Sequence, residues 1–141
     1  MPRVVADANV LVSAALARSP QAPSVLTLDA ALDGRVALVT SPLLLREVAT
    51  VLARPRLKKY VSTDEAARFV SDLAAQSVLL VDPPGPHRAV CRDPRDDYLV
   101  AFAEASGAEA IISGDLDLLA IDPAQLAVEV VTPRQFADRL D

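Results

Sequence analysis

Short apolar segments alternate with amphipathic ones along this chain, and the alternation constrains the fold more than any other feature. Apolar runs typical of buried strands occur at residues 4–6, 36–40, 77–81, 110–113 and 128–131. The segments between them have the spacing of apolar residues that is typical of helices. Strands that alternate with helices form a parallel sheet covered on both faces. The sequence therefore predicts one α/β domain, residues 1–141, with a mostly parallel five-stranded sheet.

Capping and turn residues indicate where several of these helices begin and end. Ser41-Pro42 and Thr132-Pro133 each place a capping hydroxyl before a proline at the first helical position. Ser24 is expected to cap another helix. A further helix is expected to begin at Asp96 and to end at Gly107.

Four acidic residues are expected at one edge of this sheet. Asp7 ends the first strand, and Asp115 follows the fourth. Asp97 lies in the first turn of the helix before the fourth strand, and Glu47 lies beside the apolar face of the helix after the second. Ligands of open parallel sheets bind beyond the carboxyl ends of the strands. Because like charges repel, such a cluster favours a bound cation, and oxygen ligands suit Mg²⁺ or Mn²⁺.

Three of these acids could instead have purely structural roles, and the sequence does not decide between these roles and metal binding. Asp97 could complement the helix dipole, and Asp115 could be a turn or cap residue. Glu47 could be a solvated residue paired with a nearby arginine. Asp7 is harder to explain in this way, because a charged residue that directly ends a buried strand needs a partner.

Composition argues against several classes of function. A net charge of −5 and an aromatic content of 4% argue against nucleic-acid binding through basic patches or stacked rings. They do not exclude an enzyme that reaches phosphates through metal ions. One cysteine, Cys91, and one histidine, His87, argue against disulfides, zinc sites and a Ser-His-Asp triad. A cytoplasmic setting without a signal peptide or membrane span is expected.

Four stretches taken together resemble the PIN-domain ribonucleases, and within them the VapC-like toxins of toxin–antitoxin systems. They read DANVLVSA at 7–14, SPLLLREV at 41–48, CRDPRDDYLVA at 91–101 and ISGDLDLL at 112–119. VTPRQF at 131–136 is similar to the C-terminal ending of the family. The resemblance covers nearly the whole chain. It implies a three-layer α/β/α sandwich that hydrolyses RNA phosphodiester bonds with one or two Mg²⁺ or Mn²⁺ ions.

The resemblance also implies roles for individual residues. The catalytic and metal-binding acids of the family fall on the four positions singled out above: Asp7, Glu47, Asp97 and Asp115. Supporting polar groups fall on Asn9 and on Ser113, where many members carry threonine. Asp97 is preferred to Asp96 as the ligand because the apolar helix follows it as in the family. Asp96 and Asp117 are then expected in supporting positions around the metal.

The expected partners are RNA, a cognate protein antitoxin and a second copy of the chain. The densest basic stretch holds the candidate RNA contacts, Arg54, Arg56, Lys58 and Lys59. Cations near a helix end are also expected on structural grounds alone. A homodimer is expected because a chain of 141 residues that is 52% apolar exposes apolar helix faces.

Three other classes of protein remain as alternatives. A receiver module would use Asp82 as phosphoacceptor, but it needs an acid pair after the first strand and a lysine beyond Lys59. A haloacid-dehalogenase-type phosphatase needs a second aspartate where Asn9 stands. A PIN-fold module that binds a partner without cleaving RNA is the third, and the four retained acids count against it.

Overall fold

Five strands form one sheet in the computed structural model, which describes residues 1–140. They are β1 (Arg3–Ala6), β2 (Ala37–Thr40), β3 (Val78–Leu79), β4 (Ala110–Ile112) and β5 (Glu129–Val131). Their order across the sheet is β3-β2-β1-β4-β5, and every neighbouring pair is parallel. The predicted five-stranded parallel sheet is confirmed.

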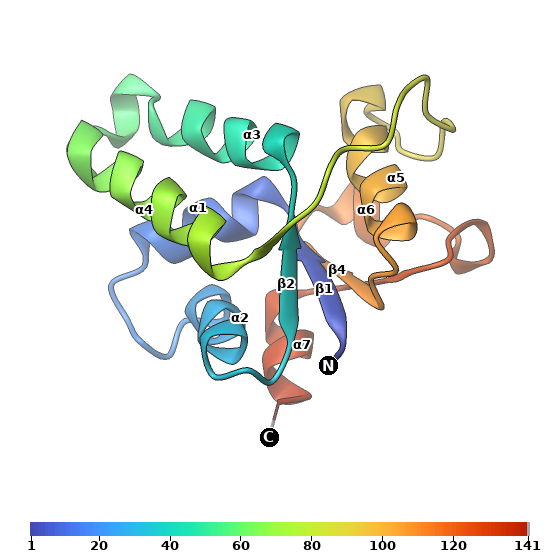
Figure 1. The fold of residues 1–141 in the computed structure, drawn as a ribbon, viewed down its shortest axis with the longest axis horizontal. Helices are drawn as coiled ribbons and strands as arrows, with labels where there is room; N and C mark the ends of the chain where they lie inside the picture. Colours follow the sequence, from blue (N-terminus) through green and yellow to red (C-terminus); the bar gives the residue numbers. More distant parts are fainter. Residues whose placement is uncertain (141) are drawn as a thin grey trace.

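Helices cover both faces of this sheet. They are α1 (Ala8–Leu16), α2 (Pro23–Leu32), α3 (Pro42–Leu52), α4 (Thr63–Gln76), α5 (Asp97–Ala105), α6 (Leu116–Leu119) and α7 (Pro133–Asp138). Short 3₁₀ turns occur at η1 (Pro55–Leu57), η2 (Pro94–Asp96) and η3 (Pro123–Gln125). Figure 1 shows α5 on one side of the strands and α1 to α4 on the other, which gives the expected three layers. No helix within residues 1–140 is long and apolar enough to cross a membrane.

Most of the predicted helix starts are confirmed. Ser41 caps α3 by accepting a hydrogen bond from the backbone N–H of Leu44 at 3.2 Å. Thr132 caps α7 in a reciprocal capping box with Gln135. The prediction that Ser24 caps α2 is wrong, because the helix already begins at Pro23 and Ser24 is buried in its first turn.

Aliphatic side chains build most of the core, because the chain has few aromatic residues. The largest side chains with almost no exposed surface include Phe102, Leu11, Leu44, Leu52 and Ile111. They come from three helices and a central strand, so one apolar core lies on both faces of the sheet. Parallel sheets need this coverage because both faces of each strand are apolar.

The third strand is shorter than predicted and lies at the edge of the sheet. It covers Val78–Leu79 rather than residues 77–81. Beyond it, the N–H of Leu80 still donates to the carbonyl of Thr40 at 2.8 Å. The chain then reaches two prolines after Asp82, and proline has no N–H with which to continue a strand ladder.

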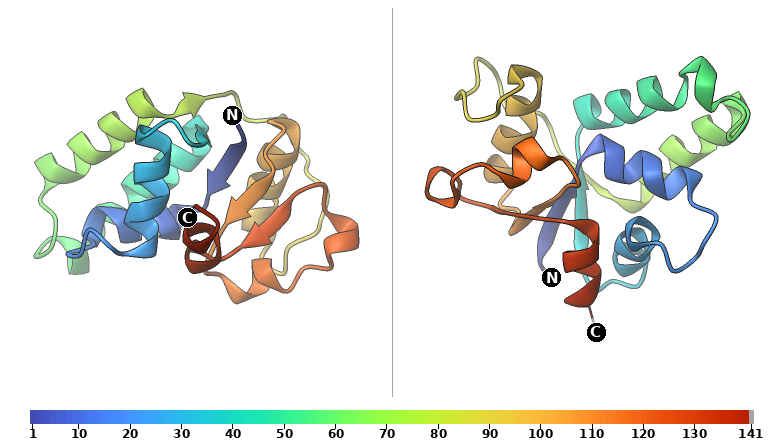
Figure 2. Two further views of the ribbon diagram at one scale, coloured as in Figure 1. Left: turned by 90° about the horizontal axis from the view of Figure 1, so that it is seen from below. Right: turned by 180° about the vertical axis from the view of Figure 1, so that it is seen from behind.

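The strand order reverses direction at β1, because β2 lies on one side of it and β4 on the other. Ligands of open α/β sheets bind at such a switch point, beyond the carboxyl ends of the strands. Both chain ends lie at the opposite end of the molecule, as Figures 1 and 2 show. Because the switch point lies at β1, a functional site is expected beyond the carboxyl ends of β1 and β4.

Candidate active site

In-register pairing of β1 with β4 brings Asp7 beside Ser113. Ala6 pairs with Ile112, and the N–H of Asp7 donates to the carbonyl of Ile112 at 3.0 Å. Asp7 and Ser113 are the next residues along the two strands. The hydroxyl of Ser113 donates a hydrogen bond to Oδ2 of Asp7. Two residues 106 positions apart in the sequence thus share one polar contact at the strand ends.

The Asp7 carboxylate is buried, with 6% of the residue exposed. Its Oδ1 accepts a hydrogen bond from the N–H of Val10 at 2.8 Å and so caps α1. Burial raises the pKa of Asp7, and the carboxylates of Asp115 and Glu47 raise it further. Hydrogen bonds from Ser113 and Val10 offset only part of this increase in pKa. Buried acids with a perturbed pKa are concentrated at functional sites.

A small cavity of about 30 Å³ lies against Asp7, and we call it the acidic cavity. Four carboxylate residues from separate parts of the chain line it: Asp7, Glu47, Asp96 and Asp115. Within residues 1–140, no three acidic, histidine or cysteine side chains form a ready-made metal site. The carboxylates therefore surround the cavity without converging on a single point.

Glu47 is held in place by Tyr98. The phenol O–H of Tyr98 donates to Oε1 of Glu47 at 2.6 Å, which joins α5 to α3 across the cavity. Burial raises the pKa of Tyr98, and the Glu47 carboxylate raises it further, so the phenol remains a hydrogen-bond donor. The sequence analysis missed Tyr98, and its nearness to the acids at the start of α5 is the only signal that could have found it.

Asp96 ends the η2 turn and lines the acidic cavity. Burial raises its pKa from 3.8 to about 6, and four neighbouring carboxylates contribute, among them Asp115 and Glu47. The anion of this half-buried acid is less favourable than that of an aspartate in water. Its surroundings therefore favour a cation close by.

Asp97, the preferred ligand, lies next to Asp96 at the start of α5 but outside the lining of the acidic cavity, and its role as a ligand stays a prediction. Asp97 is buried, and its Oδ1 accepts hydrogen bonds from the backbone N–H groups of Cys91 at 2.8 Å and Val90 at 3.2 Å. Burial alone would raise the pKa of Asp97, but these hydrogen bonds outweigh it and lower the pKa. Asp97 fixes the loop before η2, and the acidic cavity is lined by Asp96 instead.

Asp115 combines a structural position with a place in the acidic cavity. Its Oδ1 accepts from the N–H of Asp117 at 2.9 Å and caps α6, while its own N–H donates to Oγ of Ser113 at 3.0 Å. Asn9 is exposed and lines the same cavity. Asp117 lies 3.7 Å from Arg92, measured from carboxylate oxygen to guanidinium nitrogen, and does not line the cavity.

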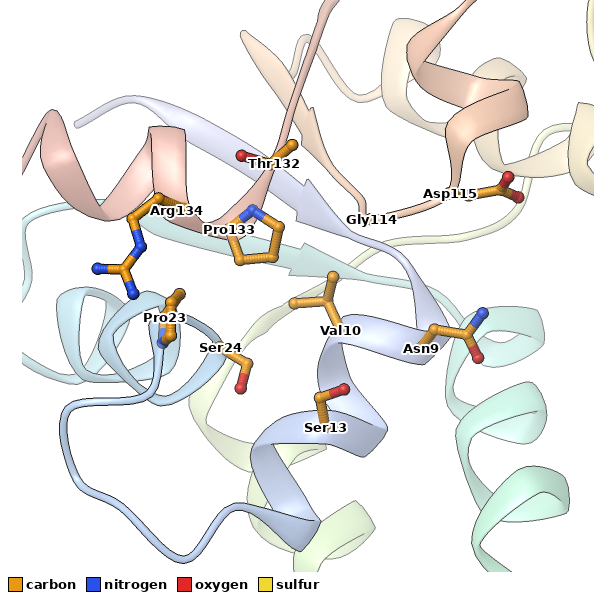
Figure 3. Close-up of a pocket in the computed structure, with 10 residues that line it drawn as sticks. All are labelled: Asn9, Val10, Ser13, Pro23, Ser24, Gly114, Asp115, Thr132, Pro133 and Arg134. Carbon is orange, nitrogen blue, oxygen red and sulfur yellow. The ribbon is translucent and has the colours of Figure 1, made fainter.

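A second, larger cavity of about 680 Å³ adjoins the acidic one and shares Asn9 and Asp115 with it. We call it the Arg134 groove. Figure 3 shows Val10 and Pro133 between Asp115 on one side and Arg134 on the other. Sequence analysis did not single out this groove. It exists because β5 lies next to β4, which brings the start of α7 beside the residues after β4.

The acidic cavity suits a divalent cation by its donor chemistry. All charged residues that line it are carboxylates, which are the donors that Mg²⁺ and Mn²⁺ prefer. Burial is the first cause of the raised pKa values of Asp7 and Asp96, and repulsion by the neighbouring carboxylates adds to it. A cation among them would offset that repulsion.

The candidate RNA contacts of the basic stretch lie apart from the acidic cavity. Arg54, Arg56, Lys58 and Lys59 are exposed around η1, at the tip between α3 and α4, and line neither cavity. Their contact with RNA stays a prediction. Burial and the adjacent Asp97 raise the pKa of the Cys91 thiol to about 12, which argues against a nucleophilic role.

Comparison with known proteins establishes the family. The model of the PIN domain family matches residues 3–117, which is most of the chain. The chain belongs to the PIN domain family. PIN domains are generally nucleases and typically use divalent metal ions. Membership also removes the receiver and phosphatase alternatives.

Individual relatives are similar over almost the whole length of this chain. The uncharacterized protein MJ1680 of Methanocaldococcus jannaschii is 29% identical, over 99% of this chain and 92% of its own length. PAE2754 from Pyrobaculum aerophilum has a TM-score of 0.63 at 20% identity, over 99% of this chain and 89% of its own. VapBC2 from Rickettsia felis, bound to a DNA fragment from its promoter, has a TM-score of 0.60 at 10% identity, over 92% of this chain and 98% of its own. The two solved structures support the fold.

Proposed function

We propose that this PIN domain is an endoribonuclease dependent on Mg²⁺ or Mn²⁺, and that it is the toxin of a type II toxin–antitoxin system. The acidic cavity carries the proposal, because four carboxylate residues line it beyond the carboxyl ends of the strands. Family membership supports a nuclease. The resemblance of the sequence motifs to VapC-like ribonucleases supports RNA as the substrate.

Each residue of the acidic cavity has a role in this proposal. One or two divalent ions, when bound, neutralise charge on the scissile phosphate and lower the pKa of the attacking water. The residues that would hold them are Asp7, Glu47, Asp96 and Asp115. Ser113 orients Asp7, and Tyr98 orients Glu47, through the hydrogen bonds described above. Asn9 offers an amide to the substrate at the boundary with the Arg134 groove.

The toxin role implies a protein antitoxin as partner. It is supported by the similar fold of the Rickettsia felis VapBC2 structure. An antitoxin could block the acidic cavity by inserting an arginine or lysine among its carboxylates, because a desolvated charge pair with several hydrogen bonds binds strongly. Both proteins would act in the cytoplasm, as the single cysteine suggests.

We further propose that the toxin is a homodimer. Apolar side chains are exposed on and after the edge strand β3, where Val78, Leu79 and Val81 have 38%, 51% and 85% of their surface exposed. A two-fold interface is the commonest way to cover such side chains. Light scattering at tens of micromolar protein tests this, and a monomeric mass would contradict it.

Cleavage of RNA by the purified chain tests the enzymatic proposal. We expect a fluorescent single-stranded RNA to be cut with Mg²⁺ or Mn²⁺, and EDTA to abolish the cleavage. Asp7→Asn should lower the rate by about a thousandfold, because it removes one charge from the centre of the acidic cavity. Asp138→Asn, at an exposed position at the end of α7, is the matched control and should cleave normally.

The same experiment separates the enzyme from a PIN-fold module that only binds a partner. Calorimetric titration should show Mg²⁺ binding by the intact chain and weaker binding by Asp7→Asn, which keeps three of the four carboxylates. Absence of both cleavage and Mg²⁺ binding in the intact chain would favour the binding module. Equal cleavage by Asp7→Asn and the intact chain would show that the reaction occurs elsewhere.

A further inference from the structure

The Arg134 groove differs chemically from one end to the other. Its floor is apolar, because Val10, Pro23 and Pro133 line it between α1, α2 and α7. At one end it opens to Asn9 and Asp115, which it shares with the acidic cavity. Figure 3 shows the Arg134 guanidinium at the other end, beyond Pro133. Its volume of about 680 Å³ lies within the range of about 300–1,000 Å³ that is typical of small-molecule sites.

Arg134 is available for a ligand. It is exposed and makes no ion pair with another residue in the described part of the chain. Among the residues that line the two cavities, it alone is basic. Arginine binds phosphate through two parallel N–H donors, so an unpaired arginine beside a nuclease centre suits a phosphate of the substrate.

The start of α2 adds further polar groups on the same side of the groove. Within residues 1–140, no side chain caps the first turn of this ten-residue helix, although Ser24 lies within it and lines the groove. Ser13 of α1 adds an exposed hydroxyl, and Figure 3 shows both hydroxyls near Val10. Hydroxyls and backbone N–H groups contact phosphate and sugar oxygens in nucleic-acid complexes.

We propose that the Arg134 groove binds the ribonucleotide next to the scissile phosphate, with Arg134 on the following phosphate of the RNA strand. This inference rests on the proposed function and assigns the path of the substrate. The sugar or base packs on Val10, Pro23 and Pro133, and the strand leaves the acidic cavity past Asn9 and Asp115.

The charge pattern favours an RNA strand over a segment of an inhibitor protein. RNA carries a phosphate at every nucleotide, so one strand can place one phosphate at a metal-loaded acidic cavity and another at Arg134. An inhibitor segment that inserts a cation into the acidic cavity would need an acidic side chain as well to pair with Arg134 at the other end of the groove. A cationic occupant is therefore disfavoured along the groove.

Binding of RNA without cleavage tests the groove directly. The probe is a fluorescein-labelled single-stranded RNA of twelve nucleotides, and the protein carries Asp7→Asn so that the strand stays intact in Mg²⁺. Adding Arg134→Gln should weaken binding by about tenfold, and it should reduce the slope of log affinity against log salt by about one. The matched control is Arg35→Gln, which removes the same charge just before β2, at the other end of the strands.

A second variant tests the groove by shape rather than by charge. Ser13→Leu fills the groove from an exposed helical position, where the larger side chain is compatible with the helix. We expect it to weaken RNA binding by about tenfold with the salt slope unchanged, because it displaces the nucleotide and removes no charge.

The outcomes separate this inference from the proposed function. Equal RNA affinity in the Arg134→Gln and Arg35→Gln proteins would leave the groove to another occupant, such as a protein segment, and would overturn the inference. Absence of RNA binding to the Asp7→Asn protein would overturn it as well. If the intact chain binds RNA through Arg134 and yet cleaves none, the groove stands and the proposed catalytic function fails.

Discussion

Two adjacent aspartates face different surroundings: Asp96 lines the acidic cavity, and Asp97 contacts the loop before η2. These surroundings have opposite effects on the two pKa values. Asp96 meets other carboxylates, and its pKa is raised to about 6, first by burial and then by those charges. Asp97 is also penalised by burial, but it meets the N–H groups of Cys91 and Val90, and its pKa is lowered. The same residue type thus lines the proposed metal site in one region and supports the fold in the other.

The difference shows that the partners of a carboxylate decide its role. A carboxylate that accepts several backbone hydrogen bonds is stabilised as an anion, and it stabilises the fold that provides them. A carboxylate among other carboxylates destabilises the fold until a cation binds. Function is therefore expected where the acidic side chains are poorly satisfied by the protein itself.

The largest expected effect concerns metal binding by the two aspartates. Asp96→Asn should weaken Mg²⁺ binding by at least about tenfold, because it removes a carboxylate of the acidic cavity. Asp97→Asn should bind Mg²⁺ within about threefold of the unaltered chain, since Asp97 does not line the cavity. Calorimetric titration of both variants measures this. The reverse order of affinities would restore Asp97 as the ligand.

Tyr98 connects the two regions, because it follows Asp97 in α5 and its phenol reaches Glu47. Tyr98→Phe should lower kcat about tenfold at saturating RNA, because Glu47 loses the hydrogen bond that orients it. Tyr60→Phe removes the hydroxyl of the other tyrosine, which is exposed before α4, and should leave kcat unchanged. Single-turnover cleavage rates measure the difference. An equal rate for both variants would remove the positioning role from Tyr98.

The smallest expected effect is on stability without metal. The folded-state pKa of Asp96 lies above its ordinary value of 3.8, so ionised Asp96 destabilises the fold. The cost is absent below about pH 4, grows as the pH rises to 6 and is constant above it. Asp96→Asn should therefore raise the unfolding free energy by about 1 kcal/mol at pH 8, after allowance for solvent screening of a half-exposed group.

Asp97 provides the contrast in the same measurement. Its folded-state pKa is lowered, so its contribution to stability is present above its ordinary pKa of 3.8 and is lost as the pH falls through the folded-state value. Asp97→Asn should accordingly destabilise the fold at pH 8. Urea unfolding in EDTA at pH 8 and pH 4 compares the two variants. Destabilisation by Asp96→Asn at pH 8 would indicate that this acid supports the fold.

Local signals in the sequence were sufficient for most of the fold. Ser41-Pro42 and Thr132-Pro133 carry the chemistry of a helix start within a few residues, so α3 and α7 begin where predicted. Gly107 has a φ of 72°, a conformation that glycine adopts without strain, and it follows α5 as predicted. Ser24 was misplaced because Pro23 is an equally good first residue of a helix.

The sequence by itself also determined the edge of the sheet at which the acidic side chains gather. In a parallel sheet, all carboxyl ends of strands lie on one side, so Asp7, Ser113 and Asp115 had to approach one another once their strands were recognised. Glu47 follows from the same rule, because its helix begins where β2 ends.

Only the tertiary structure decided which side chains at that edge face the cavity. Successive residues of a helix point about 100° apart, so the orientation of Asp96 and Asp97 depends on how η2 joins α5 and where the loop at Cys91 lies. The contact between Tyr98 and Glu47 joins positions 51 residues apart, and the place of Arg134 beside Asp115 requires β5 to pair with β4. Such contacts depend on the packing of distant segments, which no local pattern of residues encodes.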